Sequence, residues 1–106
     1  MINALINNQW ESVPEKDLQF GSDSFAFGTG LYETFRTLNH KPVFLEPHLD
    51  RLFQSAQGID LTIPFSQNEI VEMIARVVQQ FDDPTQRARI LAVPEKIIIY
   101  THSDCL

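Results

Sequence analysis

A chain of 106 residues is long enough for one domain with a packed core, and a hydrophobic content of 43% is typical of a globular protein. The formal net charge of −6, with basic residues scattered along the chain, argues against a surface for nucleic acid. One cysteine leaves no internal disulfide, and neither a signal peptide nor a membrane-spanning apolar run is found. We therefore expect a cytoplasmic protein.

The N-terminal part predicts a β-hairpin followed by a loop. Residues 2–6 and 9–13 are short strand-like runs, and Asn7-Asn8 between them is a turn by composition. Residues 14–24 are polar and indicate a loop.

Residues 31–38 predict a strand with two faces of mixed character, because side chains alternate between the faces of a strand. One face carries Leu31, Glu33, Phe35 and Thr37, and the other carries Tyr32, Thr34, Arg36 and Leu38. We expect helices to cover one side of this strand and something polar, such as a site, to lie on the other.

A first helix is expected after a turn at residues 39–42 and a short strand at residues 43–45. Pro47 suits the first turn of a helix, and Gly58 is a stop signal. Between them the apolar residues recur with a helical period: Leu49, Leu52, Phe53 and Ala56.

A second helix and two strands complete the expected elements. Ser66 and Glu69 form an S-x-x-E capping box, and apolar residues hold the helical period from there to Phe81. Residues 88–93 and 96–101 are short strand-like runs linked by Pro94-Glu95. The sequence predicts one α+β domain over residues 1–106, a mostly antiparallel sheet with two helices packed on one face.

Arg51 is the first candidate for a functional role, because it lies among apolar residues on the first predicted helix. One interpretation is an arginine whose stem runs along the edge of the core while its charge stays in water. The other is an anion site, because the planar guanidinium fork suits a phosphate dianion.

Arg87 and Arg89 form a second candidate, because residues two apart share one face of a strand. Like charges side by side are unfavourable unless they meet an anion. The alternative is an exposed edge strand guarded by charges. His102 and Cys105 have no second ligand pair, so we expect no zinc site.

Two motifs resemble those of the class IV aminotransferases. The run from Gly28 to Arg36 reads GTGLYETFR, and His48 to Leu52 reads HLDRL. That family includes branched-chain aminotransferases, D-amino acid aminotransferases and aminodeoxychorismate lyases, all users of pyridoxal 5′-phosphate. The local match looks closest to the aminodeoxychorismate lyase branch, and it covers only the N-terminal lobe of the family's two lobes.

The resemblance implies roles for particular residues. Arg51 would bind the cofactor phosphate. Tyr32, Thr34 and Arg36 would border the substrate side of the cofactor, and Arg89 would hold a substrate carboxylate. Phe27 stands where family members often carry an aromatic residue that reaches a neighbouring subunit's site. The glycines of GTG would let the backbone pass close to a ligand.

The resemblance also implies that the catalytic lysine and the acid at the pyridine nitrogen belong to the absent second lobe. Lys16, Lys41 and Lys96 lack the family's local context. We expect a chain that is catalytically incomplete alone, with no catalytic residue of its own. The alternatives are a non-catalytic oligomerisation or regulatory module, one half of a split enzyme, or a truncated protein.

A homodimer or larger oligomer is also expected. The reason is that apolar strand faces such as residues 97–100 would lose the cover that the second lobe provides in the family.

Overall fold

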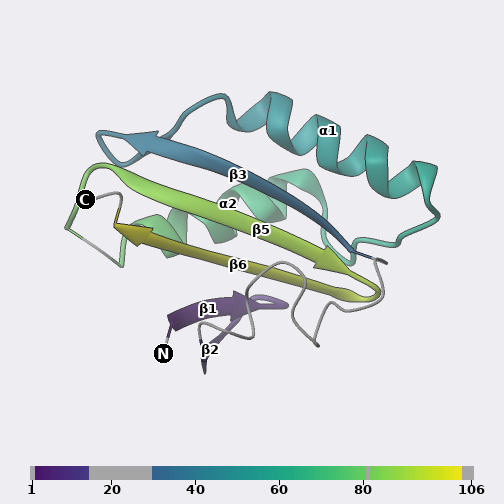
Figure 1. Cartoon of the computed structure of the whole chain (residues 1–106), viewed down its shortest axis with the longest axis horizontal. Helices are drawn as coiled ribbons and strands as arrows, with labels where there is room; N and C mark the ends of the chain where they lie inside the picture. The colour runs from purple at the N-terminus through teal and green to yellow at the C-terminus, as the bar shows by residue number, and fades with distance from the viewer. Residues whose placement is uncertain (1, 15–29, 81, 104–106) are drawn as a thin grey trace.

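The computed structural model describes residues 2–14, 30–80 and 82–103. The elements in these ranges are β1 (Ile2–Ile6), β2 (Gln9–Val13), β3 (Leu31–Leu38), β4 (Lys41–Pro42), α1 (Leu45–Gly58), α2 (Gln67–Val78), β5 (Gln86–Val93) and β6 (Lys96–Ser103). The strands form a six-stranded antiparallel sheet in the order β2-β1-β6-β5-β3-β4. In Figure 1, α2 lies behind the sheet and α1 lies next to β3 at the top. The predicted α+β class is confirmed.

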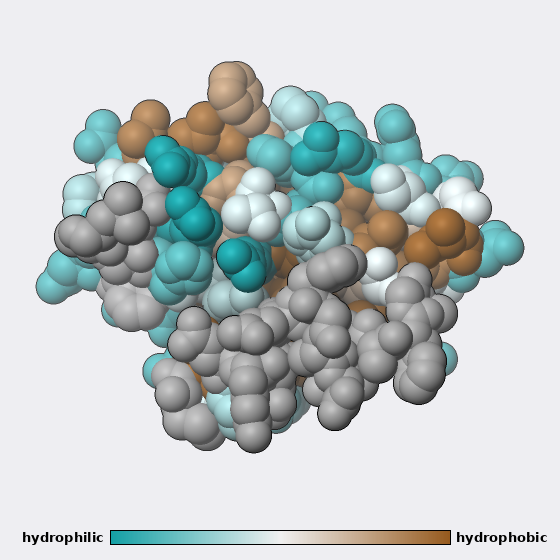
Figure 2. All heavy atoms as spheres, viewed as in Figure 1, coloured by the Kyte–Doolittle hydropathy of each residue, from teal (hydrophilic) through white to brown (hydrophobic). Residues whose placement is uncertain are grey.

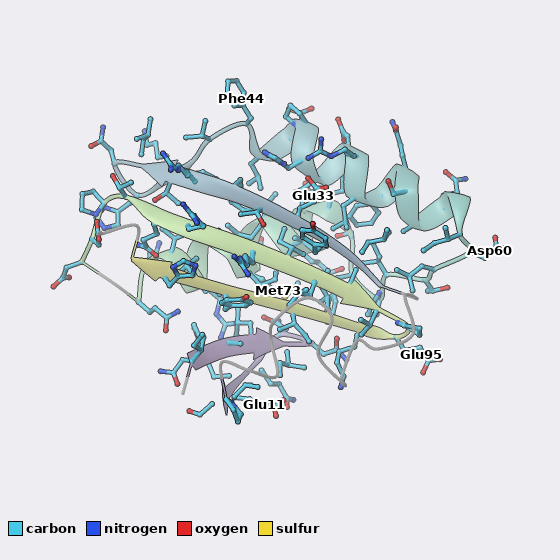
Figure 3. The ribbon with its side chains drawn as sticks, in the orientation of Figure 1. Glu11, Glu33, Phe44, Asp60, Met73 and Glu95 are labelled. Atoms are coloured by element: carbon cyan, nitrogen blue, oxygen red, sulfur yellow. The ribbon has the colours of Figure 1, made fainter. Side chains whose placement is uncertain are left out.

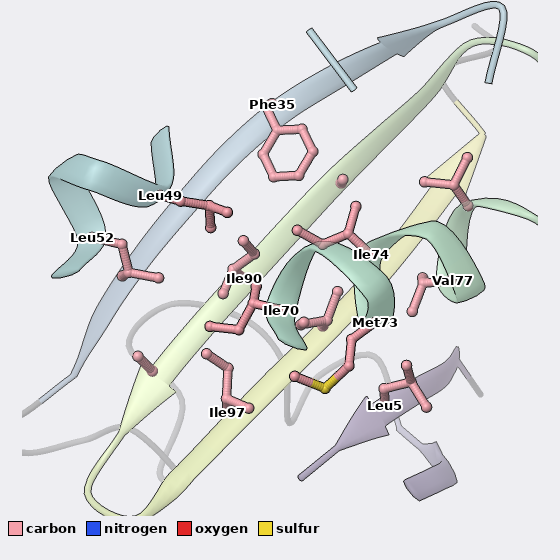
Figure 4. Close-up of a cluster of buried hydrophobic side chains, with 14 residues drawn as sticks. Leu5, Phe35, Leu49, Leu52, Ile70, Met73, Ile74, Val77, Ile90 and Ile97 are labelled. Atoms are coloured by element: carbon pink, nitrogen blue, oxygen red, sulfur yellow. The ribbon is translucent and has the colours of Figure 1, made fainter. Parts of the chain in front are cut away.

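The main core lies between the two helices and the sheet. Both helices bury one apolar stripe, and the sheet supplies the facing layer from β1, β3, β5 and β6 (Figure 4). The fully buried large side chains there are Leu5, Leu49, Leu52, Ile70, Ile74, Val77, Val78, Ile90, Ile97 and Ile99. Burying each side chain of this size contributes about 1.5–3 kcal/mol, so this layer holds α1 and α2 on the sheet.

A second, smaller apolar cluster lies on the opposite face of the sheet, formed by Ala4, Leu91, Ile98 and Tyr100. Successive residues of β6 therefore enter two different clusters, and each residue from 97 to 100 is 5% exposed or less. The expectation that this strand offers an exposed apolar patch is wrong. A strand covered on both faces reads as a continuous apolar run, and that is the reason for the run in β6.

Two asparagine-containing turns set the ends of the hairpins. Asn7 and Asn8 have φ of 49° and 67°, and Asn39 and His40 have φ of 52° and 62°. Positive φ at both central residues is the geometry of a tight two-residue hairpin turn. The first hairpin is as predicted. The second turn is tighter than predicted, because Leu38 already pairs with Lys41.

The strand expected at residues 43–45 is wrong, because the short β4 ends at Pro42 and α1 begins at Leu45. Phe44 stands between them in the left-handed region, with φ 55° and ψ 38°. Its side chain is 74% exposed and points away from the body of the molecule in Figure 3. The left-handed conformation redirects the chain from the hairpin into the helix within one residue.

The second helix begins as its sequence predicts. The Ser66 side chain accepts from the Glu69 backbone N–H at 3.2 Å, and the Glu69 carboxylate accepts from the Ser66 N–H at 2.9 Å. The helix ends at Val78, before the apolar pattern ends; Phe81 lies outside the described residues. Across the described ranges, neither helix has the length and apolar character that a bilayer crossing requires.

A buried polar cluster joins β3, β5, β6 and α2 at one end of the sheet. Gln86 Nε2 donates to the carbonyl oxygens of Val78 and Asp83 at 2.9 and 2.8 Å. The Gln86 Oε1 accepts from Thr101 Oγ1 at 2.7 Å, and the Gln86 backbone N–H donates to Thr37 Oγ1 at 2.9 Å. Gln86 is fully buried, so these bonds replace the water that it loses on folding.

Candidate functional site

A carboxylate, an imidazole and a guanidinium meet between β3 and α1. Glu33 projects from β3 toward the helix, as its label in Figure 3 shows. Arg51 donates to both carboxylate oxygens, from Nε at 3.0 and 3.2 Å and from Nη2 at 2.6 Å. His48 Nδ1 lies 2.7 Å from Glu33 Oε1 and 3.3 Å from Arg51 Nη2. The three side chains form one hydrogen-bonded unit, the Glu33–His48–Arg51 triad.

The sequence places these residues together for simple reasons. His48 and Arg51 are three apart on α1, so they lie on the same side of the helix. Glu33 shares its face of β3 with Phe35, which is buried against the helix layer and contacts the His48 ring at 5.6 Å between centroids. The buried Leu49 and Leu52 fix the orientation of α1 against this strand.

Burial and charge act on Glu33 in opposite directions. Removal from water disfavours the charged carboxylate, but the hydrogen bonds and positive charge of Arg51 and His48 outweigh it and lower the pKa of Glu33 below its usual value. In return, the Glu33 carboxylate raises the pKa of Arg51. Glu33 is 8% exposed, whereas the Arg51 side chain is 65% exposed. The anion of this pair is held inside, and the cation reaches the surface.

Replacing Glu33 by glutamine is expected to lower stability by about 1–3 kcal/mol near neutral pH, because hydrogen bonds to a charged group are lost. The stabilisation by Glu33 is fully present above the usual carboxyl pKa of 4.5 and is lost as pH falls through the lowered folded value. The difference in unfolding free energy between wild type and Glu33→Gln should therefore shrink below about pH 4.5. Urea unfolding across this range measures it, and a constant difference down to about pH 3 would contradict the role of the ionised carboxylate.

The other face of β3 carries the residues expected to face substrate. Cross-strand register places Thr34 opposite Arg89 and Arg36 opposite Arg87. On the next strand, Tyr100 pairs with Arg89. Figure 2 views this side of the molecule and shows strongly hydrophilic side chains close together over its left half. Three arginines thus share one sheet face in an acidic chain.

The Arg89 guanidinium on this face lies beside Tyr100. Its Nη1 donates to the Tyr100 hydroxyl at 3.5 Å, whereas its Nε is buried without a hydrogen-bond partner among the described residues. The strand that carries Arg87 and Arg89 lies between β6 and β3, so the interpretation of these charges as guards of an exposed edge strand is wrong.

The expected site residues therefore fall into two groups. Tyr32, Thr34, Arg36 and Arg89 lie together on the face of the sheet opposite the helices, and Arg51 lies with Glu33 on the helix side of β3. The sequence reasoning missed Glu33 as a partner of Arg51. The available signal was its alternation with Phe35 and Thr37, because a carboxylate on a helix-facing strand position needs a cation from the helix.

The remaining predicted site residues are a glycine, two lysines and several residues outside the described ranges. A Cβ on Gly30 would lie 3.1 Å from Val93 Cγ1 and 3.3 Å from the Ala92 oxygen, so this glycine lets β3 approach β5 closely. Lys41 and Lys96 are exposed in β4 and at the start of β6. Phe27, Gly28, Lys16 and Cys105 lie outside the described residues. Within the described ranges, no cluster of three or more His, Cys, Asp or Glu residues is arranged to hold a metal ion.

Solved structures of other proteins contain the same fold. The branched-chain amino acid aminotransferase from Escherichia coli superposes with a TM-score of 0.76 at 19% identity, over 96% of this chain and 41% of that one. The T.th. branched-chain amino acid aminotransferase with pyridoxamine 5′-phosphate gives 0.76 at 21%, over 98% and 40%. A putative 4-amino-4-deoxychorismate lyase gives 0.68 at 22%, over 88% and 35%. At such identities the likeness establishes the fold.

Sequence comparison identifies the family. The profile of amino-transferase class IV matches residues 30–96. The D-alanine aminotransferase of Listeria monocytogenes serovar 1/2a is 33% identical over 79 residues, and that of Staphylococcus aureus strain N315 is 28% identical over 78 residues. These matches cover 74% of this chain but only 27% and 28% of the relatives. The chain belongs to the class IV aminotransferase family and spans about a quarter of the length of these curated relatives.

Proposed function

We propose that this chain is the N-terminal lobe of a pyridoxal-phosphate enzyme of the class IV type, in which Arg51 contacts the cofactor phosphate. The observation that carries this proposal is the Glu33–His48–Arg51 triad. One edge of the guanidinium is held by a buried carboxylate, and the side chain is nevertheless 65% exposed. A fixed, accessible arginine suits recognition of a phosphate dianion.

The residues of the chain fit part of such a cofactor site. Arg51 would hold the phosphate, and Arg89, whose Nη1 donates to the Tyr100 hydroxyl, would hold a substrate carboxylate with its guanidinium. Tyr32, Thr34 and Arg36 would border the substrate. When bound, the cofactor would act as an electron sink for charge at the substrate α-carbon. The Schiff-base lysine is proposed to come from a second lobe, because neither Lys41 nor Lys96 lies beside the triad or Arg89 in sheet register.

Amino acids are the proposed substrate class, because the relatives named above are D-alanine aminotransferases and the sheet face opposite the helices carries arginines suited to carboxylates. We place the protein in the cytoplasm on the basis of its single cysteine and its family. The choice between transamination and lyase chemistry is proposed to depend on residues of the second lobe.

Pyridoxal phosphate is expected to bind the isolated chain weakly and through Arg51. One bidentate, charge-assisted contact is worth about 1.5–3 kcal/mol, whereas a micromolar complex needs about 8 kcal/mol. Titration followed by the ³¹P NMR signal of pyridoxal phosphate should therefore show a response to the chain only at millimolar concentrations, without a visible absorption band that survives dialysis. Arg51→Ala should abolish the response, and Arg76→Ala, on the exposed side of α2, should not. A response that persists in Arg51→Ala would refute the phosphate role.

We also propose that the chain forms a homodimer or larger oligomer. The support is no longer β6, whose residues are buried, but the exposed apolar side chains of Leu38 and Phe44 near one end of β3. Apolar side chains of this size are unfavourable in water and favour association. Light scattering at tens of micromolar should give at least twice the mass of one chain. A monomeric mass would contradict this, and Phe44→Ser should shift the mass toward the monomer.

A further inference from the structure

We propose that Glu33 is a positioning residue: it fixes the Arg51 guanidinium so that the outer edge of that group is presented to a phosphate. This inference rests on the proposed phosphate role of Arg51 and adds a residue to it. The observation that suggests this role for Glu33 is its set of hydrogen bonds to Arg51 in the triad.

The hydrogen bonds within the triad determine which N–H donors of Arg51 are left for a ligand. Glu33 occupies the edge formed by Nε and Nη2, at 3.0 and 2.6 Å. A guanidinium is planar and carries five N–H donors in a fixed fork. When one edge is held by a carboxylate, the plane and the direction of the opposite edge are fixed as well. In the described part of the chain, Nη1 on that opposite edge makes no hydrogen bond of its own.

The difference in burial between Glu33 and Arg51 indicates which residue orients the other. Glu33 is 8% exposed and belongs to a strand paired along its length with β5, so its carboxylate is anchored in the sheet. The Arg51 side chain is 65% exposed and would otherwise sample many rotamers in water. Arginine carries a large rotamer entropy, which a ligand must overcome unless another contact has already ordered the side chain.

His48 supports the same arrangement from the helix. Its Nδ1 lies 2.7 Å from Glu33 Oε1 and its ring contacts Phe35, so the carboxylate is held from two sides. The oxygen Oε1 is shared between His48 and Arg51, and Oε2 accepts from Arg51 Nε. With both oxygens engaged, the carboxylate has one orientation, and the guanidinium takes its orientation from it.

The carboxylate also has an opposing effect, because its negative charge repels a phosphate. Glu33→Gln would remove that repulsion and would also weaken the hold on Arg51. Positioning predicts weaker phosphate binding in the variant, whereas competition for the guanidinium predicts tighter binding. A purely structural bridge between β3 and α1 predicts a more mobile Arg51 side chain in the variant, but no change in phosphate binding. The three interpretations therefore give different results.

The experiment follows the Arg51 Nε–H signal of the whole 106-residue chain by ¹⁵N NMR while inorganic phosphate is added. In the wild type, the Nε–H should show backbone-like order in the heteronuclear NOE and should shift saturably with phosphate. In Glu33→Gln the NOE should fall, and the phosphate dissociation constant should rise about five-fold or more. Glu46→Gln, an exposed position in the first turn of α1, removes the same charge and should leave both values near those of the wild type.

Two results would overturn the inference. One is phosphate binding in Glu33→Gln that equals or exceeds that of the wild type, with folding verified by the amide spectrum. The other requires no variant: a wild-type Arg51 Nε–H as mobile as that of a free arginine side chain. If the wild-type Nε–H is ordered but does not respond to phosphate, while Glu33→Gln loses the order, the phosphate role of Arg51 fails and the positioning of Arg51 by Glu33 is upheld.

Discussion

Replacing Gln86 by leucine is expected to lower the free energy of unfolding by about 3–5 kcal/mol. Leucine preserves most of the volume but removes three side-chain hydrogen bonds, to Val78, Asp83 and Thr101. Leaving buried polar groups without partners costs about 1–3 kcal/mol each. A loss of this size is a large part of the total stability of about 5–15 kcal/mol that a domain has, and urea unfolding measures it.

The matched control for this prediction is Gln79→Leu. Gln79 is exposed at the C-terminal end of α2, seven positions from Gln86. The same change of side chain there should alter stability by about 0.5 kcal/mol or less, as is usual at the surface. A Gln86→Leu variant that unfolds within that margin of the wild type would show that the buried cluster is not a determinant of stability.

The isolated chain is expected to show no turnover with pyridoxal phosphate. It should neither transaminate D-alanine or branched-chain amino acids nor release pyruvate from aminodeoxychorismate above background. The physical reason is that neither Lys41 nor Lys96, the lysines that the structure describes, lies beside the triad in sheet register. A positioned acid or base alone is worth about 10²–10⁴-fold in rate. Coupled assays for pyruvate and for the released oxo acid measure both reactions.

Addition of a second-lobe chain provides the positive arm of the turnover experiment. Mixing with a chain that supplies the missing lysine should restore turnover, and Arg51→Ala in the first chain should reduce it. Turnover by the isolated chain that disappears when Lys16, Lys41 or Lys96 is replaced would disprove the proposal of catalytic incompleteness.

Local signals in the sequence were sufficient for most elements of this fold. The Asn7-Asn8 turn and the Ser66 capping box each depend on residues within a few positions, and both are as predicted. The start of α1 was not predictable in the same way. Phe44 has no intrinsic preference for the left-handed conformation that it adopts, and tertiary packing of the neighbouring hairpin and helix determines it.

The neighbours of each strand in the sheet were also beyond local reasoning. The apolar run of β6 was interpreted as an exposed face, and an exposed edge strand was one of two interpretations of the charges of β5, because the sequence does not state which strands flank them. For the candidate site, the helix period placed His48 and Arg51 on one side, and strand alternation placed Glu33 on a buried face. The packing of α1 on β3 brings Glu33 together with His48 and Arg51, and the sequence does not show this packing. For this reason the triad was found in the structure and not in the sequence.

The pairing of β1 with β6 has a consequence for the speed of folding. Leu5 pairs with Ile99, so the two strands that meet there are separated by most of the chain. The hairpin β5–β6 forms the middle of the sheet, and β3 pairs with β5 although both helices lie between these strands in the sequence. Sheets built from such distant pairs have high contact order, and they fold in milliseconds to seconds rather than microseconds. The N-terminal hairpin can therefore complete its pairing in the sheet only after β6, the last strand, has formed, because β1 pairs with both β2 and β6.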